Sequence, residues 1–343
     1  MKFEQQSTIC PDTTAIDAEE ISPVPIESRE LNGEPVMTGT VFAVRWNSRL
    51  TLFLCCLLFG VLDESSSSVA VGQDGASKDS RPDILEPLIV KTPRPDYDAP
   101  VPAVISGRVL LRGGGKTSGA KDVSVTDGFS VVKTDAHGAY TLKPDPQAVF
   151  VYITRPAGYD VQGTWYKPLA ARVDFALAVA QNEDEYIFIH VTDTHVSQSP
   201  RSLQGLSRFV REANDLTPKP RFIVNSGDLL NLHKALLSLP ESGRADFRSY
   251  VGIMNHLTMP HYSVAGDHTD SSYRMDQFPR GDHRCGKALY WEFLGPNFFS
   301  FEYGRIHFVS VDFGYHLGQN QILVNGKSLE YPTNQVQPKH VTC

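Results

Sequence analysis

Cysteine is scarce in this chain, and its scarcity excludes one class of small exported protein. The 343 residues contain five cysteines, and Cys55 and Cys56 both lie inside a short apolar run. If the chain is processed after residue 70, as argued below, only Cys285 and Cys343 remain. One optional bridge is too few for a disulfide framework. The 41 % content of apolar residues is instead typical of a globular chain.

The sequence also lacks an excess of basic residues. The formal net charge is -7, and residues 1–70 carry most of it, with 4 basic and 10 acidic side chains. Residues 71–343 are nearly neutral, with 28 basic and 29 acidic side chains. Nothing here indicates a surface for a polyanion, so we expect no nucleic-acid partner.

A third absence is a hydrophobic run long enough to span a membrane. The run Leu50–Leu62 has 13 residues, whereas a bilayer-spanning helix needs about 20. Arg45 and Arg49 precede it, and Ser68-Val69-Ala70 follows with small residues. This order is typical of a secretory signal over residues 37–70, with a buried helix as the alternative. We therefore predict export to the periplasm, cell surface or extracellular space, and no stable membrane span after the signal is removed.

Two segments flank the predicted signal. Residues 1–36 carry eight carboxylates and two basic residues, which is atypical of a signal's leading region, and Met37 offers a conventional start. We interpret residues 1–36 as a non-translated or disordered extension. Residues 71–102 are polar and rich in proline, which fixes φ and lacks a backbone donor, so they are predicted to form an extended linker.

Residues 103–180 show short β-type runs separated by glycine-bearing turns. Regular spacing of this kind predicts a small antiparallel, all-β sandwich domain, which resembles transthyretin-like or regulatory-like domains. The runs are 104–111, 123–125, 129–133, 139–142 and 149–154.

Residues 185–343 change to alternating strand and helix, which predicts an α/β domain with a largely parallel sheet. Functional loops of such sheets lie at the carboxyl ends of the strands. The predicted strands are 186–191, 221–224 and 262–265, the helices are 202–216 and 245–257, and a hairpin of 298–303 and 306–311 turns at Gly304-Arg305.

Three polar clusters stand at the ends of the three predicted strands: Asp193-Thr194-His195, Gly227-Asp228 and Gly266-Asp267-His268. Three carboxylates that converge on one edge repel one another unless a cation lies between them. Oxygen donors with imidazole suit manganese, iron or zinc. A single aspartate after a strand is more often a turn or helix cap, but the ordered trio favours a metal site.

Such a site suits the hydrolysis of phosphate esters. Two ions about 3.5–4 Å apart can share a hydroxide whose pKa is lowered toward neutrality, and they can clamp the phosphoryl oxygens for in-line attack. His268 could then supply a proton or hydrogen bond to the leaving oxygen or the phosphoryl group.

With these motifs the chain resembles the calcineurin-like metallophosphoesterases, whose signature runs D-x-H, G-D, G-N-H-D/E and then two later histidine motifs. The stretch GPNFFSFEYGRIHFVSVD at 295–312 is similar to the family's hairpin, and VSVTDGFSVVKTDAHGAYTL at 123–142 to the small N-terminal domain of an exported branch. The resemblance implies two divalent ions. It implies that Asp193 and His195 hold the first, Asp228 bridges both, Asp267 binds the second and His268 is the substrate-facing acid.

The sequence departs from the family pattern in two ways. Asp267 replaces the usual asparagine, and its carboxylate can still bind a metal but adds negative charge that should weaken the attraction for a phosphate anion. Thr269 replaces the acidic residue after the histidine, and Asp270 follows one place later. The later histidine motifs are missing, because His307, His316 and His340 lie in unsuitable places and are interpreted as ordinary histidines. We therefore expect an incomplete, C-terminally truncated metallophosphoesterase core.

Three hypotheses follow for function. The first is an exported phosphoesterase, impaired by this loss, that hydrolyses a phosphomonoester or phosphodiester in a small molecule or at a surface. The second is a non-catalytic remnant that binds a metal or a partner. The third is a truncated gene product.

Overall fold

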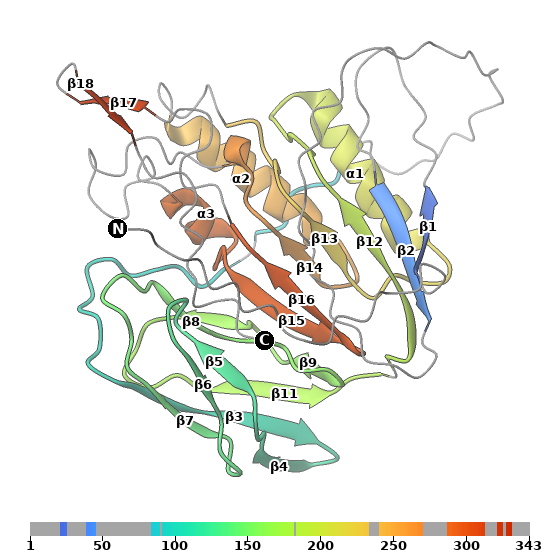
Figure 1. The fold of residues 1–343 in the computed structure, drawn as a ribbon. Coiled ribbons are helices and arrows are strands. Elements are labelled where there is room, and N and C mark those ends of the chain that lie inside the picture. The colour runs from blue at the N-terminus through green and yellow to red at the C-terminus, as the bar shows by residue number, and fades with distance from the viewer. Residues whose placement is uncertain are drawn as a thin grey trace, which may run out of the picture.

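The computed structural model describes residues 21–25, 39–45, 84–89, 91–181, 183–232, 240–269, 287–312, 321–324 and 327–330. Strands predominate over helices in this part of the chain (Figure 1). Several features predicted above lie outside the described residues, namely the apolar run Leu50–Leu62, Cys285, Cys343, His316 and His340. In the part of the chain that the structure describes, no helix is both long and apolar enough to cross a bilayer.

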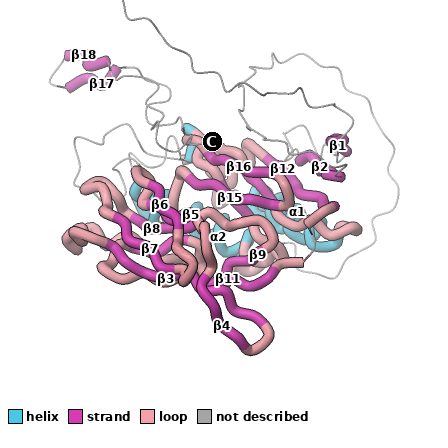
Figure 2. Tube along the Cα trace, turned by 60° about the horizontal axis from the view of Figure 1, so that its bottom comes forward, coloured by secondary structure: helices cyan, strands magenta, loops and turns pink. Residues whose placement is uncertain are grey.

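The predicted β-domain is confirmed. Figure 2 brings it toward the viewer, with strands in two sheets of order β10-β8-β5-β6 and β4-β3-β11-β9, and with β7 paired to β3. One pair, β3 with β11, is parallel, which the antiparallel expectation did not include. The strands are β3 (Ile105–Gly113), β4 (Lys116–Gly119), β5 (Ser124–Thr126), β6 (Val131–Lys133), β7 (Ala139–Leu142), β8 (Phe150–Ile153), β9 (Tyr159–Val161), β10 (Tyr166–Pro168) and β11 (Phe175–Val179).

The core of the β-domain lies between its two sheets. Successive side chains of a strand point to opposite faces, so every second residue of β3 and β11 can face inward. Val109 and Leu177 on one sheet and Val125 and Val151 on the other are fully buried in a single apolar cluster. Burial of this cluster from both sides stabilises the domain.

A second body contains a five-stranded sheet of order β1-β2-β12-β13-β14. The strands β12 (Glu185–Val191), β13 (Ile223–Asn225) and β14 (His261–Ser263) run parallel, as the strand and helix alternation predicted. Helix α1 (Pro200–Asp215) connects the first two and α2 (Pro240–Met254) the last two. The carboxyl ends of β12, β13 and β14 therefore meet at one edge (Figure 1).

The other two strands of this sheet come from the beginning of the chain. Strand β1 (Ile21–Pro25) pairs antiparallel with β2 (Gly39–Arg45), and β2 pairs antiparallel with β12. Neither strand was expected, since both fall in the segments interpreted as an extension and a signal.

The two faces of the parallel strands are covered differently. On one face Ile189 and Val191 pack with Ala213 of α1. On the other face Phe188 and Phe222 pack against the predicted hairpin, which is β15 (Phe299–Tyr303) and β16 (Ile306–Ser310). The remaining elements are η1 (Asp267–Thr269), α3 (Ala288–Phe293), β17 (Gln321–Val324) and β18 (Lys327–Glu330).

Residues 84–89, which we call the strap, belong to the predicted linker and pack along the helices. The backbone N–H of Leu85 donates to Ser207 Oγ of α1 at 2.9 Å, and that of Leu88 donates to the carbonyl of Gly252 in α2 at 3.1 Å. Leu85 also packs against the apolar cluster under these helices. The strap has no helix or strand, but it is fixed to the second body by hydrogen bonds.

Candidate metal centre

Hydrogen bonds join the three loops that carry the polar clusters. The backbone N–H of Asp193 donates to the carbonyl of Gly227 at 3.0 Å, and that of His195 to the carbonyl of Asp228 at 2.8 Å. The loop after β13 reaches the third cluster through Leu232, whose N–H donates to the carbonyl of His268 at 2.9 Å. The loops therefore form one connected layer above the strand ends.

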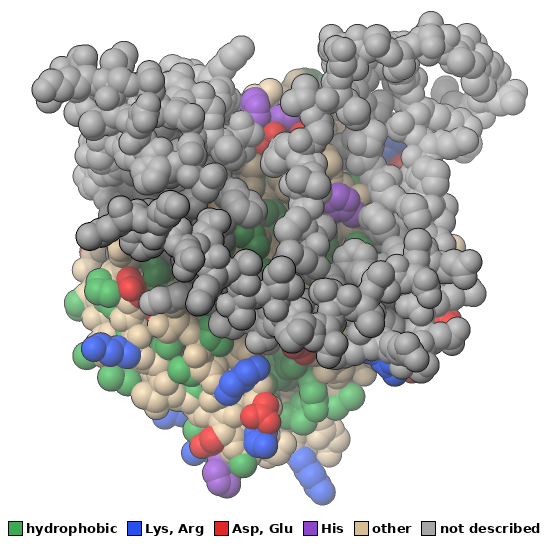
Figure 3. Space-filling view, viewed as in Figure 1, with side chains coloured by type: hydrophobic (Ala, Val, Ile, Leu, Met, Phe, Trp, Pro, Cys, Tyr) green, Lys and Arg blue, Asp and Glu red, His purple; other side chains and the backbone are tan. Residues whose placement is uncertain are grey.

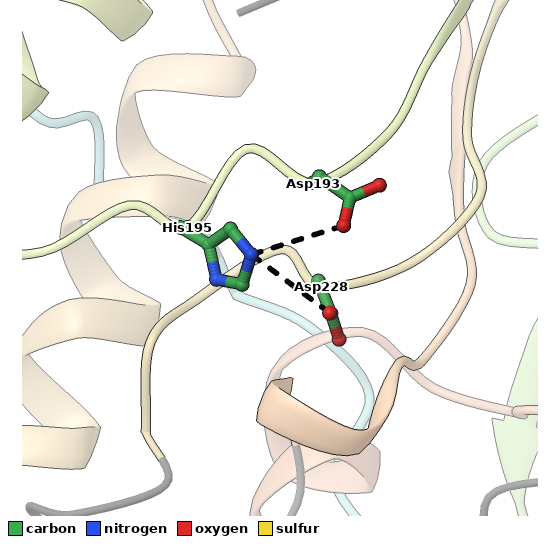
Figure 4. A group of neighbouring side chains, drawn as sticks. All are labelled: Asp193, His195 and Asp228. Carbon is green, nitrogen blue, oxygen red and sulfur yellow. Dashed lines mark ion pairs between the residues drawn. The ribbon is translucent and has the colours of Figure 1, made fainter. Parts of the chain in front are cut away.

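Asp193, His195 and Asp228 lie together in this layer, as the sequence predicted (Figure 4). Their ligand atoms all lie within 4.8 Å of one another. His195 Nε2 is 3.8 Å from Asp193 Oδ1 and 3.8 Å from Asp228 Oδ2. The Asp228 side chain is only 11 % exposed, whereas that of Asp193 is 57 % exposed. The group thus has a buried carboxylate at its base and an open side toward solvent.

All three residues have a backbone conformation that L-amino acids rarely adopt. The φ angle is 55° at Asp193, 40° at His195 and 47° at Asp228. A non-glycine residue in this region costs of order 1–3 kcal/mol and persists where its surroundings hold it. The hydrogen bonds between the loops supply that support, and they keep the three side chains pointing at one another.

The group fits a divalent metal ion. Bonds from nitrogen and oxygen ligands to such ions are about 2.0–2.2 Å long, so two ligands of one ion lie up to about 4.4 Å apart, and both 3.8 Å separations satisfy this limit. His195 Nδ1 is buried without a hydrogen-bond partner among the described residues. Two carboxylates and an imidazole are the donor types that manganese, iron and zinc accept.

Gly266 provides the space for Asp228. A Cβ at Gly266 would lie 2.1 Å from Asp228 Oδ1 and 2.3 Å from the Asp228 backbone nitrogen, which is closer than any real contact. The third cluster therefore begins with a glycine because the backbone of that loop passes directly against the buried carboxylate.

The two other predicted site residues lie on η1. The backbone N–H of His268 donates to Asp228 Oδ1 at 3.1 Å, and the His268 ring meets the His195 ring edge-on at 5.0 Å. His268 therefore joins the group. The backbone of Asp267 begins η1 in the same loop, but its side chain lies outside the described part of the structure.

Two neighbours of the group were not predicted. Thr192 Oγ1 donates to Asp193 Oδ2 at 2.7 Å. His190 Nε2 lies 2.8 Å from Ser226 Oγ, which links β12 to the loop after β13, and burial lowers the pKa of His190. The sequence signal that could have identified these residues is their polar character within the strand-end sequences HVTD and NSGD.

Residues 104–191 match a family model described as the N terminal of calcineurin-like phosphoesterase. This part of the chain is therefore similar to the N-terminal domain of calcineurin-like phosphoesterases. This calcineurin-like segment covers the β-domain and strand β12, and it ends two residues before Asp193. A search of curated proteins found no match.

Proposed function

We propose that this chain contains the core of a metal-dependent phosphoesterase that hydrolyses a phosphomonoester or a phosphodiester. The observation that carries the proposal is the convergence of Asp193, His195 and Asp228 at the end of a strand that belongs to the calcineurin-like segment. The mixed sheet with its helices is, in this proposal, a metallophosphoesterase core.

Each residue has a role in the proposed site. Asp193, His195 and Asp228 would hold one divalent ion, and Asp228 together with Asp267 would hold a second. Divalent ions held there lower the pKa of a water molecule and neutralise charge on the phosphoryl oxygens. The proposed ions are manganese, iron or zinc.

His268 is the proposed general acid. Its backbone N–H is bonded to Asp228 and its ring lies beside the His195 ring, so a phosphate ester held at the proposed ions would lie near it. A neutral or protonated imidazole in this place can donate to the leaving oxygen.

The proposed substrate is a phosphate ester, either a small molecule or a phosphoester at a surface, and the proposed location is outside the cytoplasm. The part of the β-domain visible in Figure 3 carries Lys, Arg, Asp and Glu side chains intermixed. The proposal assigns the selection of a phosphate ester to the strand-end loops, which carry the proposed ligands.

The proposal is tested with the purified chain, stripped of metal and then titrated with Mn²⁺. We expect saturable Mn²⁺ binding and Mn²⁺-dependent hydrolysis of bis-p-nitrophenyl phosphate or p-nitrophenyl phosphate. Asp228→Asn should weaken Mn²⁺ binding at least tenfold, because it removes the charge of the buried ligand. His268→Ala should lower kcat by about 10²-fold or more and leave Mn²⁺ binding unchanged.

Other outcomes separate the alternatives. Mn²⁺ binding without turnover of either ester would favour the non-catalytic, metal-binding function. Failure to bind Mn²⁺, Fe²⁺ or Zn²⁺ in a folded protein would overturn the proposal.

A further inference from the structure

A chain of hydrogen-bonded polar side chains, most of them buried, runs beneath the three loops of the candidate metal centre. It begins at Thr194, which lies between two proposed ligands and whose Oγ1 donates to the carbonyl of Leu229 at 2.9 Å. Asn225 Nδ2 lies 3.3 Å from Thr194 Oγ1 and 3.2 Å from the hydroxyl of Tyr250. The Tyr250 hydroxyl lies 3.1 Å from Ser263 Oγ.

The members of this chain come from each element that supports the site. Thr194 follows β12, Asn225 ends β13, Ser263 ends β14 and Tyr250 lies on α2. Asn225 is three residues before Asp228, and Ser263 is four residues before Asp267. Tyr250 is the one side chain in this set that contacts both β13 and β14, so it is the hub of the network.

The direction of the hydrogen bonds follows from the donors present. The amide of Asn225 has two N–H groups, one for Thr194 Oγ1 and one for the Tyr250 oxygen. Either the Tyr250 hydroxyl or the Ser263 hydroxyl can donate in the bond between them. Burial raises the pKa of Tyr250 to about 12, so its hydroxyl keeps its proton throughout the neutral range.

Three of the four residues in the network are shielded from solvent, which makes their hydrogen bonds costly to break. Tyr250 is 0 %, Asn225 1 % and Ser263 8 % exposed. A buried polar group that loses its partner bears the full desolvation penalty of that group, which a shift of the surrounding backbone toward a new partner would relieve. Such a shift would move the loops that carry the proposed ligands.

We infer that Tyr250 is a positioning residue of the metal centre, acting through Asn225 and Thr194 on the first loop and through Asn225 and Ser263 on the second and third. This inference rests on the proposed function. Tyr250 is not one of the proposed ligands, and its proposed role is to fix the distance between His195 and Asp228.

The test compares Mn²⁺ binding by the full chain and by Tyr250→Phe, which keeps the ring and removes only the hydroxyl. We expect the Mn²⁺ dissociation constant to rise about tenfold, the usual effect of removing a group that orients a metal ligand. The EPR spectrum of bound Mn²⁺ should also change line shape, because the ligand geometry changes.

Tyr140→Phe is the matched control. Tyr140 is 5 % exposed and lies in the β-domain, where its hydroxyl donates to the carbonyl of Val173 at 2.7 Å. Both substitutions remove a buried tyrosine hydroxyl, so both should lower Tm. Only Tyr250→Phe should weaken Mn²⁺ binding.

Thr194→Val is a second variant, and it tests the same network if Tyr250→Phe does not fold. It should raise the Mn²⁺ dissociation constant severalfold, and the double variant should lose less affinity than the product of the two single effects, because both act through Asn225. Unchanged binding in the folded variants, or equal weakening in Tyr140→Phe, would overturn the inference alone. Absence of Mn²⁺ binding in the wild type would overturn the proposed function and the inference with it.

Discussion

Gly266 shows how little room a single residue has at the candidate site. We predict that Gly266→Ala weakens Mn²⁺ binding at least tenfold, because the new Cβ would lie 2.1 Å from Asp228 Oδ1 and must displace that carboxylate. The φ angle of Gly266 is not in the left-handed region, so the clash and not the backbone conformation causes the effect. Isothermal titration with Mn²⁺ measures the change.

Gly205→Ala is the control for this prediction. Gly205 lies within α1, and a Cβ there has nothing within 4 Å. Replacing a helical glycine with alanine should stabilise the fold by about 0.5–1 kcal/mol and leave Mn²⁺ binding as it is. If Gly266→Ala also bound Mn²⁺ like the wild type, the contact between Gly266 and Asp228 would be refuted.

Single residues of the site were predictable to the extent that they follow strands. Asp193, His195 and Asp228 could be placed together because parallel strands end at one edge. Their left-handed backbone could not be predicted, since nothing in D-T-H or G-D requires it. The role of Tyr250 was also hidden, because on α2 it reads as one more apolar position of an amphipathic helix.

Elements with a clear period were predicted well, and elements defined by their partners were not. Helix 202–216 matches α1 because its apolar residues recur near every 3.6 positions. Strand β10, Tyr166–Pro168, has only three residues, one of them a proline, so only its pairing with β8 identifies it as a strand. Strand β2 is likewise defined by its register with β12.

The strap was predicted as part of an extended linker, but it packs on α1 and α2. A substitution at Gly252 of α2 tests this packing. A Cβ at Gly252 would lie 2.6 Å from Pro87 Cβ and 3.0 Å from the Leu88 nitrogen. We predict that Gly252→Ala displaces the strap, because alanine suits the helix but leaves no room for Pro87. Faster amide exchange at Leu85 and Leu88, and faster proteolytic cleavage nearby, would be the observable results.

The comparison variant is again Gly205→Ala, on a helix position that the strap does not touch. It should leave exchange at the strap unchanged. Equal exchange at Leu88 in Gly252→Ala and the wild type would show that the strap does not pack on α2 in solution.

At the scale of the whole molecule, a buried ion pair lies where the two bodies meet, and no sequence pattern predicted it. Arg155, two residues after the end of β8, contacts Glu183 Oε1 at 2.5 Å, and its backbone carbonyl accepts from the backbone N–H of Glu302 in β15 at 2.8 Å. The second carboxylate oxygen of Glu183 accepts from the backbone N–H of Gly158 and of Gly304. The two domains were predictable from the change of residue pattern along the chain. The junction was not predictable, because it joins residues that are far apart in the sequence.

This junction makes the stability of one body depend on the other. The side chains of Arg155 and Glu183 are 6 % and 5 % exposed, so Arg155→Met leaves a buried carboxylate without its cation. We predict a loss of about 3 kcal/mol in unfolding free energy, the lower end of the range for such a break, because two N–H donors still serve Glu183. Arg208→Met, which breaks an exposed pair with Glu212 on α1, should cost less than about 1 kcal/mol.

Urea unfolding followed by tryptophan fluorescence measures both free energies of unfolding, since Trp165 lies against Phe299 of the hairpin at this junction. In Arg155→Met the transition should also broaden or split, because the β-domain and the sheet body then unfold less cooperatively; a single transition at the wild-type midpoint would show that the pair does not couple them.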